Sequence, residues 1–231
     1  PRDVAQSIGL NDVERLCDGD VRNDPVRGQA PASLLNSYHD ERLEAAQRNV
    51  QVTNRTSRFL RPAEPVAQVF RRATLDLAKQ HRFARNLVNT GRMAEANTYS
   101  RSAACAGGGV SVQNVAFRWA NGRPGQFNDL IDWAGGALLL TLFGPISAAE
   151  VTRLRQLALQ TPLLRVVQVL APGEKPQAVE HIDDRHGHVR QTCRALDRRW
   201  ALVRPDAYLA STGHAVDGEL IRSLARALAL A

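Results

Sequence analysis

Two short apolar segments separated by a capped amphipathic stretch constrain the fold of this chain more than any other feature. They span residues 137–143 and 163–170, and continuous apolar runs of this length are typical of strands that are covered on both faces of a sheet. Between them, Ser147 and Glu150 have the spacing of a capping box, and the residues that follow repeat their apolar side chains at helical spacing. A strand, a helix and a second strand of these lengths predict a parallel pair joined by a crossover helix.

The last third of the sequence extends this unit. Residues 200–203 and 208–211 are rich in strand formers, and the Pro-Asp pair at 205–206 predicts a tight turn between them. A helix with one apolar face is predicted over residues 216–230. A β-α-β unit followed by a hairpin and a helix has the element order of a thioredoxin core. We therefore predict an α/β fold in which residues 133–231 form a thioredoxin-like domain, a mixed sheet with flanking helices.

The cysteines argue against redox chemistry in that domain. A working thioredoxin needs two cysteines close together at the start of its helix, because one thiol must be held as thiolate and resolved by the other. The segment 143–150, where that helix begins, contains no cysteine, and Cys17, Cys105 and Cys193 stand far apart. We therefore expect a structural or docking domain without redox cysteines, and a reducing, cytoplasmic location.

The remainder of the chain divides by composition into three stretches. Residues 1–30 are polar and rich in turn-forming residues, and residues 31–96 predict connecting helices, the first capped by Ser33 and the last closed by Gly91. Residues 97–132 are dominated by small and polar side chains, so we predict an irregular linker there.

Charge and hydropathy exclude two classes of partner. The formal net charge is +7, but the basic residues are scattered among acidic ones and no nucleic-acid-binding motif occurs. The longest apolar run, residues 137–143, is far shorter than the ~20 residues that cross a bilayer. We therefore predict neither nucleic acid nor membrane as a partner.

Few side chains suggest catalysis or metal binding. His181, His186 and His188 would form a metal site if the fold brought all three together, but we favour a polar turn because their spacing matches no defined motif. No Gly-rich dinucleotide fingerprint follows a predicted strand, and no nucleophile elbow occurs. We therefore predict no catalytic residue and no metal ligand. We expect the three tryptophans to anchor packing and not to stack on a ligand: Trp119, Trp133 and Trp200.

Three segments nevertheless resemble the flavoprotein aromatic hydroxylases of the phenol hydroxylase and 3-(3-hydroxyphenyl)propionate hydroxylase type. Residues 7–16, with Gly9, Asp12 and Leu16, resemble the segment that ends the flavin-binding domain of that family. Residues 28–46 resemble its next landmark, in which a tyrosine precedes a Glu-Arg pair at the start of a long helix. The sequence WALVRPDAYLA at 200–210 resembles its C-terminal signature, in which a strand runs into Arg-Pro-Asp and back out.

The resemblance carries expectations about cofactor, substrate and organisation. It implies FAD as cofactor, NAD(P)H as co-substrate and a phenolic aromatic substrate that the reduced flavin hydroxylates with oxygen. Residues 1–30 would be a remnant of the flavin-binding domain, and the helices of 31–96 would complete it. Gln6, Ser7 and Gly9 are the residues implied to bind the cofactor, through backbone donors at the flavin ring.

The chain also departs from the family pattern. Ser7 stands in the place of an asparagine, Gly19 and Pro25 interrupt a segment that the family continues as a helix, and Ala207 replaces a glycine of the hairpin. Because the family's dinucleotide-binding fingerprint precedes the matching region, we expect this C-terminal portion to be inactive alone. The alternative hypothesis is a non-catalytic thioredoxin-like module for interaction or homodimerisation.

Overall fold

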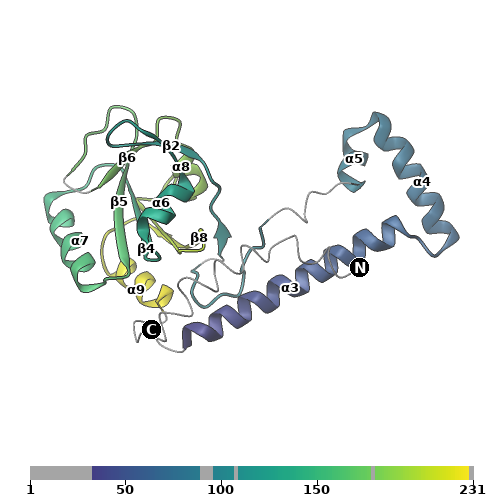
Figure 1. The fold of residues 1–231 in the computed structure, drawn as a ribbon, viewed down its shortest axis with the longest axis horizontal. Coiled ribbons are helices and arrows are strands. Elements are labelled where there is room, and N and C mark those ends of the chain that lie inside the picture. Colours follow the sequence, from purple (N-terminus) through teal and green to yellow (C-terminus); the bar gives the residue numbers. More distant parts are fainter. Residues whose placement is uncertain (1–32, 89–95, 107–108, 178–179, 229–231) are drawn as a thin grey trace. The chain divides into compact units, whose positions relative to one another are not determined.

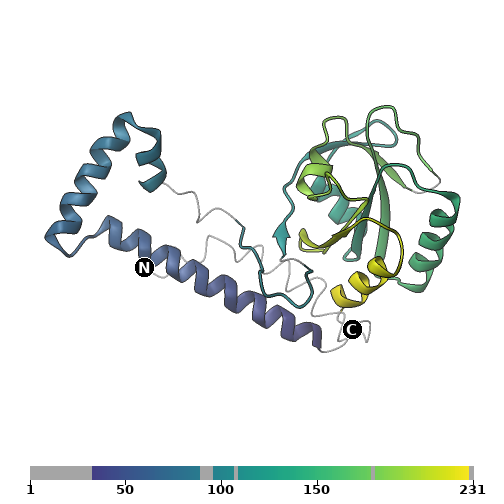
Figure 2. The ribbon, with the colours of Figure 1, turned by 180° about the vertical axis from the view of Figure 1, so that it is seen from behind.

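The computed structural model describes residues 33–88, 96–106, 109–177 and 180–228 (Figures 1 and 2). The chain divides into two compact units. One comprises Glu41–Asn97, which we call the helical unit, and the other contains the chain from Thr98 onward, which we call the sheet unit. The predictions for residues 1–30 lie outside the described residues.

The helical unit contains the connecting helices that the sequence predicts. Helix α3 spans Ser33–Leu60 and begins ahead of the unit, α4 spans Pro65–Gln80 and α5 spans Arg82–Val88. Pro65 occupies the first turn of α4, where backbone N–H groups have no acceptor within the helix, so the missing N–H of proline costs no hydrogen bond. The sequence predicted one helix through this region, but the extended backbone of His81 divides it into α4 and α5.

Side-chain hydrogen bonds stabilise the break at His81. The carbonyl groups at the end of a helix have no intrahelical donor. Here Arg85 donates through Nε to the carbonyl oxygen of Ala78 at 2.8 Å and through Nη2 to that of Lys79 at 3.2 Å.

Among the described helices, none combines the length and the apolar character needed to cross a bilayer.

The sheet unit is built on one mixed sheet of eight described strands in the order β1-β8-β7-β4-β5-β6-β2-β3. Strand β4 pairs in parallel with β5, and β5 pairs in parallel with β6, while the other neighbours are antiparallel. The strands are β1 (Val110–Ser111), β2 (Ala116–Trp119), β3 (Pro124–Gln126), β4 (Leu138–Phe143), β5 (Leu164–Leu170), β6 (His181–Asp183), β7 (Trp200–Val203) and β8 (Tyr208–Gly213).

Helices cover both faces of this sheet (Figures 1 and 2). Helices α6 (Phe127–Ala134) and α8 (His188–Thr192) pack with Leu139 and Phe143 of β4 in one buried cluster. Helices α7 (Ala148–Gln160) and α9 (Gly218–Ala227) pack with Leu138, Leu140 and Leu142 in another. Because successive side chains of a strand point to opposite faces, every residue of β4 is buried. This explains the continuous apolar run in the sequence.

The local predictions for the β4-α7-β5 unit are confirmed. The two strands are parallel over their whole paired length. The Ser147 backbone N–H donates to Glu150 Oε2 at 2.8 Å, and the Glu150 N–H donates to Ser147 Oγ at 3.2 Å, which completes the capping box.

The predicted Pro-Asp hairpin is also present, between β7 and β8. The N–H of Ala207 donates to the carbonyl of Arg204 at 3.0 Å, and the N–H of Arg204 donates to the carbonyl of Tyr208 at 2.8 Å. Ala207 has φ of 59°, the left-handed conformation that follows a type I turn in such hairpins. This conformation favours glycine, the residue that the family resemblance places at this position.

Residues 97–132 differ from the irregular linker that the sequence predicts. They contribute β1, β2, β3 and the first turns of α6. Strands β2 and β3 extend the sheet beyond β6, and β1 extends it at the other edge beyond β8. These strands are short, and β3 includes Pro124 and Gly125, residue types that normally argue against a strand. Within the segment predicted as a polar turn, residues 181–183 form β6 between β5 and β2. The turn itself follows them, where the Gly187 N–H donates to the carbonyl of Asp184 at 3.3 Å. The domain boundaries given above stay predictions.

Candidate binding groove

The sites named from sequence fall into two groups in the structure. Gln6, Ser7 and Gly9, the residues implied to bind flavin, lie outside the described residues. His181 lies in β6, and the rings of His186 and His188 lie 5.4 Å apart at the start of α8. Over the described ranges no three His, Cys, Asp or Glu side chains gather as a metal site would require. The alternative of a histidine metal site is therefore not supported.

Neither described cysteine lies at the start of α7. Ser147 is the N-cap residue of α7, and its side chain accepts a hydrogen bond from the Glu150 N–H. Cys105 and Cys193 are both buried free thiols. Burial raises the pKa of Cys193 to about 12, so its thiolate is scarcely populated at neutral pH.

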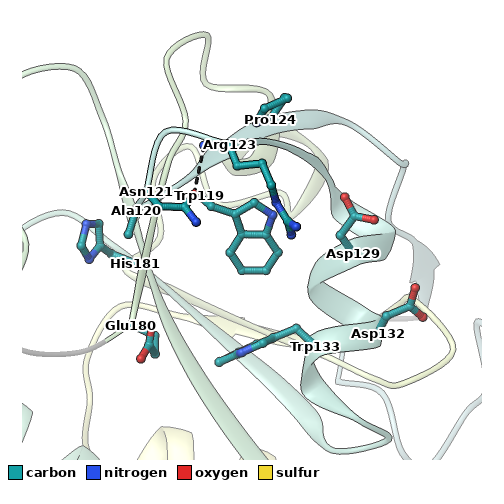
Figure 3. Close-up of a pocket in the computed structure, with 10 residues that line it drawn as sticks. All are labelled: Trp119, Ala120, Asn121, Arg123, Pro124, Asp129, Asp132, Trp133, Glu180 and His181. Atoms are coloured by element: carbon teal, nitrogen blue, oxygen red, sulfur yellow. Dashed lines mark hydrogen bonds between the residues drawn. The ribbon is translucent and has the colours of Figure 1, made fainter.

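The sheet unit carries an open groove of about 940 Å³, formed by the β2–β3 hairpin, α6 and the start of β6 (Figure 3). Sequence reasoning missed it because most of its lining belongs to the segment predicted as a linker. The lining combines two indoles, three carboxylates and one guanidinium. The residues are Trp119, Ala120, Asn121, Arg123, Pro124, Asp129, Asp132, Trp133, Glu180 and His181.

The β2–β3 hairpin fixes the first indole. The backbone N–H of Trp119 donates to the carbonyl of Arg123 at 2.8 Å, and Gly122 between them has φ of 79°. The ring of Phe117 packs edge-on against the Trp119 ring at 5.0 Å, and the Arg123 guanidinium lies 5.9 Å from its centroid. A Cβ on Gly125 would come within 2.7 Å of Trp119 Nε1, so this close approach requires glycine.

Helix α6 provides the second indole and two carboxylates. The Gln126 N–H donates to Asp129 Oδ2 at 2.7 Å, which fixes the start of the helix, and Gly135 ends it with φ of 62°. Residues three and four apart share a helix face, so Asp129, Asp132 and Trp133 lie on the groove side. The opposite side of α6 is buried in the core through Phe127, Leu130 and Ala134.

The groove is locally acidic in a basic chain. The lining contains three carboxylates, Asp129, Asp132 and Glu180, and one guanidinium, Arg123, so its local formal charge is −2 with His181 neutral. Within the described ranges, the carboxylates of Asp132 and Glu180 accept no hydrogen bond and form no ion pair. The lining offers cation and aromatic recognition but no nucleophile with an adjacent base.

FAD does not fit this groove. The cofactor carries an anionic pyrophosphate, and proteins hold such groups with backbone N–H groups or with excess cationic side chains. The three carboxylates of the groove would repel it instead. The described residues therefore give no flavin-binding site at this position.

Comparison with solved structures places the fold. No protein-family model matches the chain, and no curated protein does. RebC with bound 7-carboxy-K252c is 20% identical with a TM-score of 0.55, and the match covers 90% of this chain and 39% of that one. CabE, an aromatic hydroxylase from angucycline biosynthesis, is 20% identical with a TM-score of 0.54, covering 89% and 37%. Aklavinone-11 hydroxylase, solved with FAD and aklavinone, is 18% identical with a TM-score of 0.55, covering 89% and 37%.

These matches confirm the resemblance seen in the sequence at the level of the fold. The chain has the fold of a portion of the FAD-dependent aromatic hydroxylases. It spans less than two fifths of the length of each of these three proteins. What those proteins bind and catalyse as wholes is therefore a matter of proposal for this chain.

Proposed function

We propose that this chain is the C-terminal portion of an FAD-dependent, NAD(P)H-using monooxygenase that hydroxylates phenolic aromatic compounds in the cytoplasm, and that it is inactive alone. The observation that supports this most directly is the extent of the structural likeness. Each of the hydroxylase-type structures matches 89–90% of this chain, which covers both the helical unit and the sheet unit. A domain that only shared the sheet would match the sheet unit alone.

We also propose that the sheet unit is thioredoxin-like and serves without sulfur chemistry. Its central strands follow the order β8-β7-β4-β5, with β4 and β5 parallel and the β7–β8 hairpin antiparallel beside them. Helix α7 connects the parallel pair and α9 closes the unit. The serine cap of α7 and the buried, high-pKa thiol of Cys193 favour a structural role for this domain.

The exposed apolar side chains of the helical unit support the proposal of a missing partner portion. On α4, Val66 is 80% exposed, Val69 70% and Phe70 59%, and Leu77 continues the same stripe two turns later. Apolar residues at this spacing normally pack against another part of a protein. We propose that the flavin-binding portion of the enzyme covers this stripe, with Gln6, Ser7 and Gly9 supplying backbone donors near the flavin ring.

The proposal is tested by lengthening the chain. The DNA upstream of the codon for Pro1 is expected to encode a strand followed by a Gly-rich dinucleotide fingerprint. The longer polypeptide should stay yellow after desalting and should consume NAD(P)H in the presence of a phenol. An upstream region without that fingerprint, or a longer protein that retains no flavin, would contradict the proposal.

Two variants of the longer protein test the role of α4. Replacing Val69 and Phe70 together by Asp should release the flavin, because two carboxylates cannot be buried in an apolar contact without a large penalty. The matched control is Gln68→Asp, on an exposed residue of the same helix outside the stripe. Equal flavin retention in both variants would show that the stripe does not pack against the flavin-binding portion.

The alternative function, an interaction or dimerisation module, is favoured by one observation, the open groove of the sheet unit. It predicts a purified chain that retains no flavin and elutes as a dimer in size-exclusion chromatography. A monomeric chain would count against homodimerisation.

A further inference from the structure

The groove leaves aromatic surface and negative charge available at the same place. Trp133 is 38% exposed, whereas Trp200 in the core is fully buried. Figure 3 shows Asp129 and Asp132 on one side of the groove and Glu180 with His181 on the other, with the two indoles between them. An exposed indole beside carboxylates recognises cations, because the ring face and the carboxylate both attract positive charge.

The groove already contains one example of this recognition. The guanidinium of Arg123 lies over the ring of Trp119 at 5.9 Å from its centroid. Of the two indoles, only Trp119 has a cationic side chain over its ring in the described part of the chain. Two carboxylates near Trp133 also have no ion-pair partner among the described residues. One belongs to Asp132 on the same helix and the other to Glu180 across the groove. The second half of the groove therefore has a ring face and two carboxylates to offer.

Charge complementarity selects the occupant. The groove has a local formal charge of −2, so it favours a cation over an anion or a neutral ring. A wide, open groove of about 940 Å³ encloses a small cation poorly, but it accommodates an extended peptide whose basic side chain enters between the walls. Arginine suits this setting best, because its planar guanidinium both stacks on aromatic rings and pairs with carboxylates.

We propose that this groove is a docking site for an arginine-bearing segment of a partner polypeptide. The guanidinium would lie against the exposed Trp133 ring and pair with Asp132 and Glu180, while Arg123 stays over Trp119. This role is independent of flavin, so its test does not depend on the monooxygenase proposal.

The test uses the full chain and a short blocked peptide, Gly-Arg-Gly-Gly-Arg-Gly. Titration should change the tryptophan fluorescence and release heat in calorimetry. Trp200 is fully buried and the Trp119 ring is covered by Arg123, so most of the fluorescence change should disappear in Trp133→Leu. The same peptide with citrulline in place of arginine keeps the shape and loses the charge, and it should bind at least about fivefold more weakly. Equal binding of both peptides, or no binding of the arginine peptide, would overturn the proposal.

Variants of the groove locate the binding. The double variant Asp132→Asn with Glu180→Gln should weaken the arginine peptide about fivefold, the combined effect of two exposed ion pairs. The matched control is Asp197→Asn, which removes an exposed carboxylate that does not line the groove and should leave the affinity unchanged. Unchanged far-UV circular dichroism confirms folding of each variant. Phenol that displaces the peptide would overturn the proposal by assigning the groove to an aromatic small molecule.

A charge-swapped variant tests for a reversed peptide preference and not only for a loss of binding. With Asp132→Arg and Glu180→Arg together, the groove should accept Gly-Glu-Gly-Gly-Glu-Gly in preference to the arginine peptide. An unaltered preference for arginine would contradict the assignment of these two carboxylates.

Discussion

In the sheet unit, apolar side chains from both helical layers meet those of the central strands in buried clusters, whereas in the helical unit the large apolar side chains of α4 and α5 are mostly exposed. Leu140 in β4 is fully buried, while Leu77 in α4 is 46% exposed and Phe83 in α5 is 62% exposed. The sheet unit has therefore closed its own core, and the helical unit has apolar surface left to bury. This difference suggests that the two units contribute to stability and to association in separate ways.

The tryptophans allow the two units to be followed separately. Trp119, Trp133 and Trp200 all lie in the sheet unit, so tryptophan fluorescence reports its unfolding. Far-UV circular dichroism at helical wavelengths also includes α3, α4 and α5. Urea unfolding followed by both signals thus distinguishes changes in one unit from changes in the other.

The strongest test of the comparison is the same substitution in each unit. Leu140→Ala should lower the free energy of unfolding by about 2–5 kcal/mol, because it leaves a cavity in a closed core. Leu77→Ala should change it by no more than about 0.5 kcal/mol, because this side chain is exposed and alanine favours helix. Equal losses in the two variants would show that the helical unit is packed as tightly as the sheet unit.

Packing around Trp200 gives the next largest effect. Gly213 lies opposite Trp200 in the β7–β8 register, and a Cβ there would lie 2.2 Å from a ring carbon of the indole. Gly213→Ala should therefore destabilise the sheet unit by about 1–3 kcal/mol, measured by tryptophan fluorescence. The control is Gly218→Ala at the start of α9, where the added methyl meets only the flexible Arg222 side chain at 3.3 Å. A mild Gly213→Ala phenotype would mean that this core can repack.

Helix capping should make stability pH-dependent in the sheet unit. The backbone N–H of Ser147 lowers the pKa of Glu150 below its usual value, and the nearby Arg199 guanidinium acts in the same direction. The resulting stabilisation is present above the unfolded pKa and is lost as the pH falls through the folded one. Glu150→Gln should cost about 1 kcal/mol at pH 7 and less at pH 3.

The matched control for capping lies in the helical unit. Glu64 occupies the N-cap of α4 and makes no capping hydrogen bond through its side chain. Glu64→Gln should therefore leave the unfolding curve unchanged within about 0.5 kcal/mol. A pH-independent Glu150→Gln difference, measured by urea unfolding at both pH values, would remove the capping box as its cause.

The smallest expected effect is a gain. Ala207→Gly removes the strain of a left-handed backbone at a residue with a Cβ, which costs about 1–2 kcal/mol. Glycine also raises the entropy of the unfolded chain, which destabilises the fold by about 0.4–1 kcal/mol. The net result should be a stabilisation of the sheet unit by about 0.5 kcal/mol. In the interior of α4, Ala73→Gly should instead destabilise by about 1 kcal/mol. Opposite signs in thermal unfolding would confirm the turn geometry, and a loss in both would contradict it.

The sequence predicts this fold best where one local signal decides the structure. The continuous apolar runs at 138–143 and 164–170 belong to strands that are covered on both faces, and the Ser147–Glu150 pair sets the start of α7 without help from distant residues. The hairpin turn is likewise decided locally, by its proline and aspartate.

The parts that could not be predicted depend on partners distant in sequence. Strands β2 and β3 are short, and β2 joins the sheet by pairing with β6, whose residues lie more than sixty positions further along the chain. The groove is built from these strands and α6, so it was missed with them. One signal was available: Phe127, Leu130 and Ala134 have helical spacing and are followed by Gly135. Trp133 was expected to anchor packing, but its position next to Asp132 on the solvent side of α6 leaves it 38% exposed.

The shortness of the two outermost strands has a consequence for self-association. The unpaired backbone edges of the described sheet are β1, with two residues, and β3, with three residues that include Pro124. Such edges offer little template for adding strands from another molecule. At high concentration the chain should therefore resist sheet extension, and any dimer that forms should use helix faces or side-chain docking.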